Sequence, residues 1–213
     1  MLAKGSFTWV VAALMFAIIT RFGANITSSH TLHAISSVGF GITLLFITFF
    51  RDPYRKIVEC SDCALSPADG KVIDIKETTD HEYITVSIFM NIYNVHVNRA
   101  PLSGVVKNIE YKRGSYLPAF IKNSEKNERN IITISTKYGD IVVTQIAGTV
   151  TRRIVSYVYE GKHIEKGERI GMIKFGSRVD ITLPKDFKLS VKKGDSVRAG
   201  KTVIATRTRG YLL

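Results

Sequence analysis

Two long runs without a charged residue open the chain and constrain its fold more than any other feature. They are FTWVVAALMFAIIT, residues 7–20, and ISSVGFGITLLFITFF, residues 35–50. Each run is shorter than the ~20 apolar residues that span a bilayer comfortably, so either run alone fits a buried core helix or a signal-peptide core. Because only a short polar link separates them, we expect residues 1–56 to form a membrane-associated hydrophobic helical hairpin.

Basic residues flank the two runs at their outer ends. Lys4 precedes the first run, and Arg51, Arg55 and Lys56 follow the second, whereas the link carries only Arg21. Positive charge favours the cytoplasmic side of a membrane, so this distribution predicts that both ends of the hairpin are cytoplasmic. A shallow hairpin that only dips into the bilayer is the alternative to a full crossing. We therefore expect the chain at the cell membrane, with its remaining domain on the cytoplasmic side.

The amino-acid pattern of the sequence changes after about residue 57. Short stretches rich in Val, Ile and Tyr alternate with Gly, Pro, Asp and Asn, and several show the period of two that half-buried strands have. The break KYGD, residues 137–140, is typical of a hairpin turn. Residues 57–213 are therefore expected to form a mainly β domain of many short strands, with no long helix.

Two segments of this region share one plan. They are YEGKHIEKGERIGMIKFG, residues 159–176, and LSVKKGDSVRAGKTVIATR, residues 189–207. The second is similar to the hammerhead turn of biotinyl and lipoyl carrier domains, which indicates a barrel-sandwich core. The modifiable lysine of those carriers is missing, so a carrier function is disfavoured and the similarity concerns the fold alone.

The net charge of the chain limits the classes of partner that it is expected to bind. Lys and Arg number 30 against 18 Asp and Glu, which gives a formal net charge of +12. Such an excess favours nucleic acid, an anionic membrane surface or a phosphorylated substrate. The apolar hairpin favours the membrane among these, and we expect no nucleic-acid partner.

The two cysteines form a single C-x-x-C pair, Cys60 and Cys63. A lone pair without a second pair or a nearby histidine is weak support for zinc. We therefore expect two reduced thiols and no metal site, in keeping with a cytoplasmic domain.

Three segments offer candidate acid–base and anion-binding groups. They are LSPADGKV (65–72), FMNIYNVHVNRAP (89–101) and IAGTVTRRI (146–154). Asp69 could orient a base, although a Pro/Asp/Gly turn also explains its segment. His96 could be a general acid or base, although a lone histidine on a strand is usually structural. Arg152 and Arg153 could bind phosphate as a fork or be ordinary solvated charges. Arg99, three residues after His96, would face the opposite side of a regular strand.

The pair Gly176-Ser177, in the segment FGSRVD, permits two interpretations. A turn explains it simply. Alternatively, a strained peptide allows the Ser177 hydroxyl to attack the Gly176 carbonyl; the resulting ester eliminates to dehydroalanine, which hydrolyses to a pyruvoyl group and ammonia. His96, oriented by Asp69, would take the hydroxyl proton, as in a Ser-His-Asp arrangement. From these residues alone the turn remains the simpler interpretation.

The blocks SPADGKV, YNVHVNRAP, AGTVTRRI and FGSRVDITLP, in this order, resemble the phosphatidylserine decarboxylase family, and most of all its short, membrane-linked proenzyme form. The resemblance spans residues 65–184. It implies self-cleavage between Gly176 and Ser177, which would yield a β chain, 1–176, and an associated α chain, 177–213. The pyruvoyl group made from Ser177 would form a Schiff base with phosphatidylserine and release CO2 and phosphatidylethanolamine.

The resemblance also implies roles for other residues. Asp69 and His96 would assist maturation. Arg99, Arg152 and Arg153 are, by their own chemistry, the candidates for binding the anionic substrate. One departure matters: long-form members carry two histidines three residues apart, whereas Arg99 stands at the second position here. His96 would then serve both maturation and decarboxylation, or Arg99 would take an electrostatic role.

Two other functions fit parts of the sequence. One is decarboxylation of archaetidylserine, a lipid with ether-linked tails, by the same mechanism. The other is a non-catalytic, membrane-tethered β-barrel adaptor that binds anions, which explains the charge and the hairpin but leaves the combination of Asp69, His96 and Ser177 to chance. A homodimer is the commonest closed assembly for such a chain.

The hairpin predicts how the protein is released from membranes. If apolar helices hold the chain, washing with about 1 M NaCl should leave it in the membrane pellet, because salt screens charges but not apolar contacts. Detergent should release it. Immunoblots of pellet and supernatant would measure this, and complete release by salt alone would contradict the tether.

Overall fold

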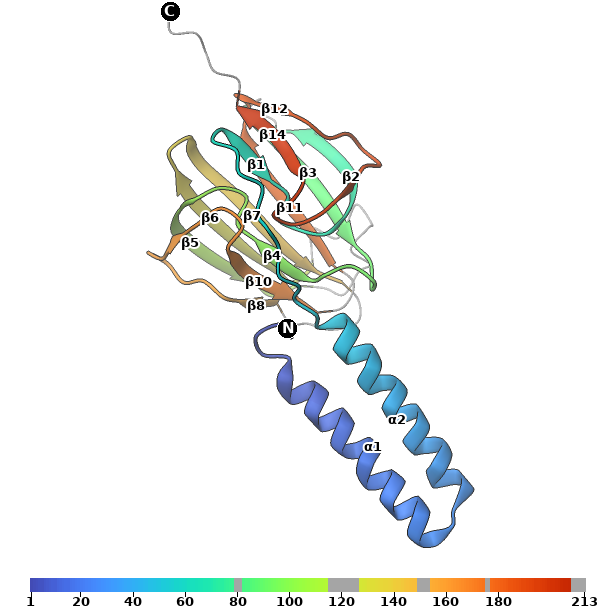
Figure 1. Ribbon diagram of the computed structural model, residues 1–213. Coiled ribbons are helices and arrows are strands. Elements are labelled where there is room, and N and C mark those ends of the chain that lie inside the picture. Colours follow the sequence, from blue (N-terminus) through green and yellow to red (C-terminus); the bar gives the residue numbers. More distant parts are fainter. Residues whose placement is uncertain (79–81, 115–126, 149–153, 175–176, 208–213) are drawn as a thin grey trace, which may run out of the picture. The chain divides into compact units, whose positions relative to one another are not determined.

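Helices and strands occupy separate parts of the chain, which divides into two units, Met1–Tyr54 and Arg55–Leu213. The computed structural model, drawn in Figure 1, describes residues 1–78, 82–114, 127–148, 154–174 and 177–207. Each unit is described by itself below.

The N-terminal unit is a helical hairpin, built from α1 (Phe7–Thr27) and α2 (His30–Phe49). The helices have 21 and 20 residues, more than the uncharged runs, because the helical backbone continues into the polar link. At about 1.5 Å per residue each helix reaches about 30 Å, the thickness of the hydrocarbon core of a bilayer. Both are therefore long and apolar enough to cross a membrane.

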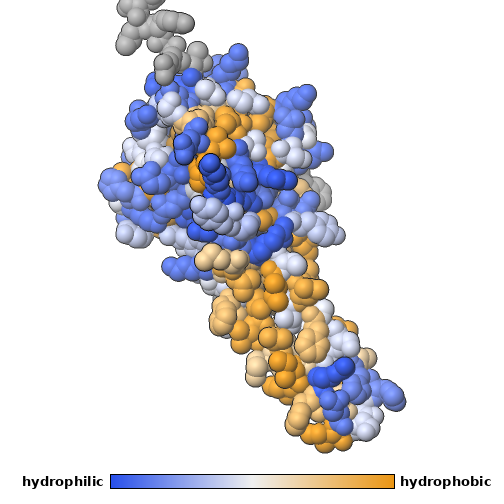
Figure 2. All heavy atoms as spheres, viewed as in Figure 1, coloured by the Kyte–Doolittle hydropathy of each residue, from blue (hydrophilic) through white to orange (hydrophobic). Residues whose placement is uncertain are grey.

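Small residues line the contact between the two helices. A Cβ on Gly39 would lie only 3.0 Å from the Cβ of Ala17, so glycine permits this approach. The Ser36 hydroxyl donates to the Ala17 carbonyl at 3.0 Å. Such contacts are typical of membrane helices. Large apolar side chains are left exposed, and Figure 2 shows apolar surface along the hairpin; they include Phe7, Phe16, Phe22, Val38 and Leu44. The hairpin therefore supports membrane association.

The second unit is mainly β, as the sequence predicts, and no helix is assigned in its described residues. The strands are β1 (Cys63–Leu65), β2 (Gly70–Glu77), β3 (Tyr83–Met90), β4 (Val97–Arg99), β5 (Gly104–Lys112), β6 (Arg129–Thr136), β7 (Gly139–Ala147), β8 (Ile154–Ser156), β9 (His163–Ile164), β10 (Arg169–Ile173), β11 (Ser177–Pro184), β12 (Phe187–Leu189), β13 (Ser196–Val197) and β14 (Val203–Arg207).

These strands form one large and two small sheets. The eight-stranded sheet has the order β13-β2-β3-β11-β7-β6-β5-β9 and curls into half of a barrel (Figure 1). The three-stranded sheets have the orders β1-β14-β12 and β4-β10-β8. All strand pairs are antiparallel, and the predicted hairpin turn at 137–140 joins β6 to β7. This confirms a mainly β domain preceded by an apolar helical hairpin.

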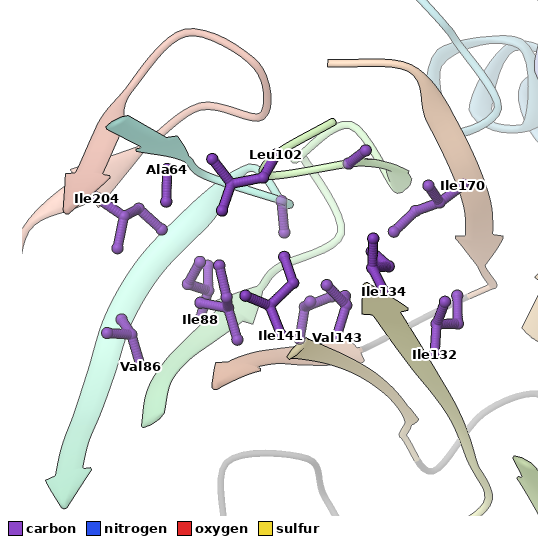
Figure 3. Packing of buried hydrophobic residues seen from close by; sticks show 14 of the residues in the cluster. Ala64, Val86, Ile88, Leu102, Ile132, Ile134, Ile141, Val143, Ile170 and Ile204 are labelled. Atoms are coloured by element: carbon purple, nitrogen blue, oxygen red, sulfur yellow. The ribbon is translucent and has the colours of Figure 1, made fainter. Parts of the chain in front are cut away.

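Aliphatic side chains from all three sheets fill the interior (Figure 3). The labelled members are Ala64, Val86, Ile88, Leu102, Ile132, Ile134, Ile141, Val143, Ile170 and Ile204. Strand β11 adds Val179, Ile181 and Leu183, each fully buried. These are alternate residues, because successive side chains of a strand point to opposite faces. Ser177, at the start of the strand, therefore belongs to the face that packs into this core.

The two segments with a shared plan form the same kind of structure. Each contains a two-residue strand, a tight turn and a longer strand, namely β9 with β10 and β13 with β14. The turns contain Gly167, with φ +82°, and Gly200, with φ +69°. A Cβ on either glycine would lie within 3.0 Å of the Ile57 side chain, which both turns therefore contact. The repeated sequence plan thus corresponds to a repeated turn.

The expectation of two reduced thiols is wrong. Cys60 and Cys63 are joined by a disulfide, with their Cα atoms 5.8 Å apart. The short turn between them brings the cysteines within the Cα separation that a disulfide requires. The Lys166 ammonium donates to the Cys60 carbonyl and lies 3.6 Å from the Cys60 sulfur. The bridge therefore ties down the segment that leads into β1.

The contact with Ile57 predicts a difference between two glycine substitutions. Gly167 and Gly161 have nearly equal φ, +82° and +83°, but a Cβ on Gly161 would have nothing within 4 Å. Gly161→Ala should destabilise the domain by about 1–2 kcal/mol through the left-handed backbone alone. Gly167→Ala should cost roughly 1–3 kcal/mol more, because it also overpacks the site. Denaturant unfolding of the detergent-solubilised protein measures both, and equal losses would contradict the packing argument.

Candidate functional site

Ser177 is the first residue of β11, in the interior of the eight-stranded sheet. It pairs with Met90 of β3 on one side and with Ala147 of β7 on the other. Its side chain is completely buried, and its hydroxyl lies 3.6 Å from the Met90 sulfur. A thioether is only a weak acceptor. The sheet therefore holds a serine hydroxyl in a dry, mostly apolar place directly after the predicted cleavage position.

The arginine and aspartate that follow Ser177 form an ion pair on the opposite face of the strand. Arg178 donates to both carboxylate oxygens of Asp180, at 2.6 and 2.7 Å, and to the Ser87 hydroxyl at 2.9 Å. Residues two apart share a face of a strand, so this pair points away from the side that carries Ser177. Its side chains are about nine-tenths buried. The pair therefore anchors the start of β11 without facing the serine.

His96 is buried just before β4. Its Nδ1 lies 2.9 Å from the Asn94 carbonyl oxygen, which can only accept, so Nδ1 carries the proton. In the neutral ring Nε2 then has the lone pair that a general base needs. The His96 carbonyl accepts from the Ile173 N–H at 3.3 Å, at the end of β10. The histidine therefore lies beside the segment that leads to Ser177.

Asp69 follows β1 and is paired with a residue that sequence reasoning did not connect to it. Arg55 donates to both of its carboxylate oxygens, at 2.5 and 2.7 Å, and the Ala199 N–H adds a third hydrogen bond at 2.8 Å. The side chains of Asp69 and Arg55 are only 11% and 7% exposed. Among the described residues, Asp69 makes no hydrogen bond to His96. In this structure the Asn94 carbonyl contacts the His96 ring, and a role of Asp69 in orienting that ring stays a prediction.

Arg55 was visible in the sequence only as one of the positive charges after the hairpin. Nothing in its spacing from Asp69 indicates a contact, because the two are brought together by the turn before Gly200 rather than by a local motif. Arg55 also donates to the Ala199 carbonyl at 2.8 Å. It therefore connects the SPADG segment to the second of the two repeated turns.

The predicted substrate-binding arginines are only partly described. Arg99 lies on β4, is nearly buried, and donates to the Gly167 carbonyl at 2.9 Å, so it contacts the first repeated turn. Gly176, Arg152 and Arg153 lie outside the described residues. The structure thus brings His96 close to the segment before Ser177 and ties Asp69 and Arg99 to the two repeated turns.

A separate cavity of about 440 Å³ lies at the β5–β9 edge and is lined by Lys137, His163 and Lys166, among others. Burial, followed by the charge of Lys137, lowers the pKa of Lys166. No candidate catalytic residue lines this cavity, so it is not assigned as the active site. Within the described ranges, no three His, Cys, Asp or Glu side chains come together as metal ligands would.

Comparison with known proteins shows the family. The model for phosphatidylserine decarboxylase matches residues 42–205, most of the chain. A protein of Methanosarcina acetivorans named putative archaetidylserine decarboxylase proenzyme is 52% identical over 212 residues, 97% of each chain. The phosphatidylserine decarboxylase proenzyme of Streptomyces griseus is 42% identical over 203 residues, 95% of this chain and 92% of its own. The chain belongs to the phosphatidylserine decarboxylase family, a family of carboxy-lyases.

Similarity to a solved structure is much weaker. Glucose permease IIA from Mycoplasma capricolum aligns with 73% of this chain and 98% of its own, with a TM-score of 0.39 and 18% identity.

The buried pair of Arg55 and Asp69 predicts a large effect of removing the arginine. Arg55→Met leaves a buried carboxylate without its partner and should destabilise the domain by about 3–5 kcal/mol. Arg55→Lys should recover only part of this, because an ammonium cannot donate as a bidentate fork. Chemical denaturation in detergent measures each change.

The matched control is the exposed pair of Arg207 and Asp186, whose side chains are 42% and 38% exposed. Arg207→Met should cost less than about 1 kcal/mol. If both arginine variants lose equal stability, the burial of the Arg55–Asp69 pair has no special importance.

Proposed function

We propose that this chain is a proenzyme that cleaves itself between Gly176 and Ser177 and then decarboxylates a lipid with a serine headgroup. The observation that carries the proposal is Ser177, completely buried at the start of a central strand, with the buried His96 hydrogen-bonded through its backbone carbonyl to Ile173, shortly before it. Family membership supports the same activity. A non-catalytic adaptor explains neither the buried Ser177 and His96 nor the family membership.

Maturation needs a nucleophile, a base and a leaving group. The Ser177 hydroxyl attacks the carbonyl carbon of Gly176 and gives its proton to a base, and the C–N bond breaks to leave an ester and a free amine. Removal of the Cα proton of Ser177 then breaks the Cβ–Oγ bond, which releases the Gly176 carboxylate and leaves dehydroalanine. Water converts the enamine form to a ketone and ammonia. His96 Nε2 is the proposed base, since Nδ1 is held protonated by the Asn94 carbonyl.

Asp69 has an indirect part in this scheme. Its carboxylate accepts from Arg55 and from the Ala199 N–H, which supports a part in organising the turn before Gly200. Arg99 contacts the carbonyl of Gly167 in the other repeated turn. We propose that Asp69 assists maturation by holding this region in place.

The place of Ser177 fits a small covalent carbonyl group. It is dry, flanked by Met90 and Ala147, and clamped by strands on both sides. A pyruvoyl group supplies a ketone that accepts the substrate amine and an electron sink for the electrons left when CO2 departs. His96 would return a proton to the substrate carbon, and Arg99, Arg152 and Arg153 would hold the anionic headgroup.

The two products of cleavage would remain together. Strand β11 belongs to 177–213, yet its backbone pairs with β3 and β7 of 1–176 over most of its length. Strands β13 and β14 of the same part pair with β2 and β1. Separating the chains would break these ladders and expose the core, so we propose a tight complex of the two chains. A homodimer of that complex remains a prediction.

The lipid tails explain the hairpin. Each buried CH₂ contributes about 0.8 kcal/mol, so a two-tailed lipid stays in the bilayer and the enzyme must come to it. We propose that residues 1–56 anchor the chain in the cell membrane and that residues 57–213 work on the cytoplasmic side. A net charge of +12 favours an anionic leaflet, with about 1 kcal/mol for each nearby Lys or Arg.

Two lipids share the serine headgroup. Phosphatidylserine is the substrate that the family description names, while relatives at 48–52% identity are named for archaetidylserine. We propose that the headgroup is the recognised part and that ether-linked archaetidylserine is accepted as well as phosphatidylserine.

The proposal predicts two chains in the purified protein. Denaturing electrophoresis and intact mass should show 1–176 and 177–213, with the smaller chain blocked to Edman sequencing because a ketone replaces its amine. Ser177→Ala should remain uncut and should release no CO2 from vesicles of either serine lipid. His96→Ala should mature more slowly, by about 100-fold for loss of a general base.

Three results would contradict parts of the proposal. An unaltered serine at position 177 in active material would reject the pyruvoyl mechanism. Activity on phosphatidylserine alone would reject the common headgroup recognition. Normal maturation of His96→Ala would reject the assigned base.

A further inference from the structure

Three amide side chains form a hydrogen-bonded chain inside the otherwise aliphatic core. Asn130 Nδ2 donates to Gln145 Oε1 at 3.0 Å, and Gln145 Nε2 donates to Asn98 Oδ1 at 2.7 Å. None of the three residues is more than 1% exposed. They come from β6, β7 and β4, so the chain crosses from the large sheet to the small β4-β10-β8 sheet. We call these three residues the amide relay.

The amide relay ends beside the proposed nucleophile. Asn98 Nδ2 lies 3.6 Å from the Met90 sulfur, and the Ser177 hydroxyl lies 3.6 Å from the same sulfur. Both groups thus contact the same buried sulfur atom. Met90 is completely buried and is the strand partner of Ser177 on β3.

The relay has a direction. Because Asn130 donates to the Gln145 oxygen, the Gln145 NH₂ group faces Asn98. Because the Asn98 oxygen accepts that bond, its own NH₂ group is turned to the Met90 sulfur, the atom that the Ser177 hydroxyl also approaches. A strong donor is therefore aimed at a weak thioether acceptor, in a place where the hydroxyl oxygen is the stronger acceptor nearby.

The surrounding backbone leaves room for the relay. A Cβ on Gly171 of β10 would lie 2.8 Å from Gln145 Nε2 and 3.1 Å from Oε1. Gly171 is also the strand partner of Asn98. Any larger residue there would displace the middle amide, so the small residue and the three amides fit as one unit.

Three buried amides give an aliphatic core little stability beyond what apolar side chains of the same shape would give. Replacing buried polar groups by apolar groups of the same shape is nearly neutral or stabilising when both partners are replaced. A polar chain that ends at a reactive side chain is therefore better explained by the reaction than by stability.

We propose that the amide relay positions Asn98 as a hydrogen-bond donor to Ser177 Oγ during self-cleavage, an inference that rests on the proposed maturation at Gly176-Ser177. The elimination step breaks the Cβ–Oγ bond, and the electron pair stays on Oγ, which leaves as an oxygen of the Gly176 carboxylate. A base takes the Cα proton of Ser177. The Asn98 N–H stabilises the negative charge that grows on Oγ, while Gln145 and Asn130 act as positioning residues that keep this N–H turned toward it.

The relay should therefore govern the second step more than the first. Losing the donor slows breakdown of the ester, so the ester between Gly176 and Ser177 should accumulate. Hydroxylamine attacks the ester carbonyl, forms a hydroxamate on Gly176 and frees an unmodified Ser177 terminus. It thus reports the amount of ester independently of any general loss of stability.

The experiment follows maturation of the full-length protein, made as the uncut precursor by cell-free synthesis with detergent. Asn98→Leu removes the donor, Gln145→Leu removes the group that orients it, and Val143→Ala is the control. Val143 lies on β7 two residues from Gln145, is completely buried and carries no polar side-chain atom. Cleavage is timed by denaturing electrophoresis with and without hydroxylamine, and the melting temperature is measured for each protein.

We expect cleavage to slow about 100-fold in Asn98→Leu and about tenfold in Gln145→Leu, with hydroxylamine-sensitive precursor accumulating in both. Val143→Ala should cleave within threefold of the rate of the unchanged protein and should accumulate no such precursor. Its melting temperature should be comparable to those of the relay variants. If Asn98→Leu does not fold, Gln145→Leu carries the test.

Three outcomes would overturn the proposal: cleavage at the unchanged rate in the relay variants, equal slowing in Val143→Ala, or slowing without accumulated ester. Failure of the proposed function would be recognised by a different result: the unchanged protein itself would not be cut at Gly176-Ser177.

Discussion

The pairing of β11 with strands on both sides is the constraint on which the rest of the structure depends. Residue 177 is hydrogen-bonded into the sheet between Met90 and Ala147, so its position is fixed by two neighbouring strands. Chain ends normally fray unless they are tied down. A terminus created at Ser177 would be tied down from the start, because the neighbouring strands belong to the other product. A reactive group at that terminus would keep a defined place without a loop or lid to hold it.

The alternation of the strand then separates two kinds of chemistry. Ser177 and Val179 face the aliphatic core, while Arg178 and Asp180 form an ion pair on the other face. The charged pair can anchor the strand without raising the polarity around the serine. Among the described residues, the amides of the relay are polar groups that reach this face, and Asn98 contacts the same Met90 sulfur as Ser177.

Much of the fold could be predicted from the sequence. What could not be predicted are contacts between residues that are far apart in the sequence. The apolar runs, the β texture and the KYGD turn are local patterns, and the hairpin and the mainly β domain follow from them. The Arg55–Asp69 pair and the amide relay join residues that are distant in sequence, so no spacing indicates them. The disulfide was missed because the lone C-x-x-C pair was weighed only as a zinc site, and reduced thiols fitted the expected cytoplasmic location. Gly176, Arg152 and Arg153 lie outside the described residues, and their roles still rest on resemblance.

The proposed site at residue 177 and the apolar hairpin would meet two different requirements of one substrate. The reacting amine and carboxylate belong to a small headgroup, which is all that must leave the membrane surface. The tails contribute about 0.8 kcal/mol for each buried CH₂ and stay in the bilayer. At the proposed site, residues near Ser177 would therefore have no need to contact the tails or to distinguish ester from ether linkages. Such a division would fit the names of relatives 42–52% identical to this chain, which differ in the lipid they give.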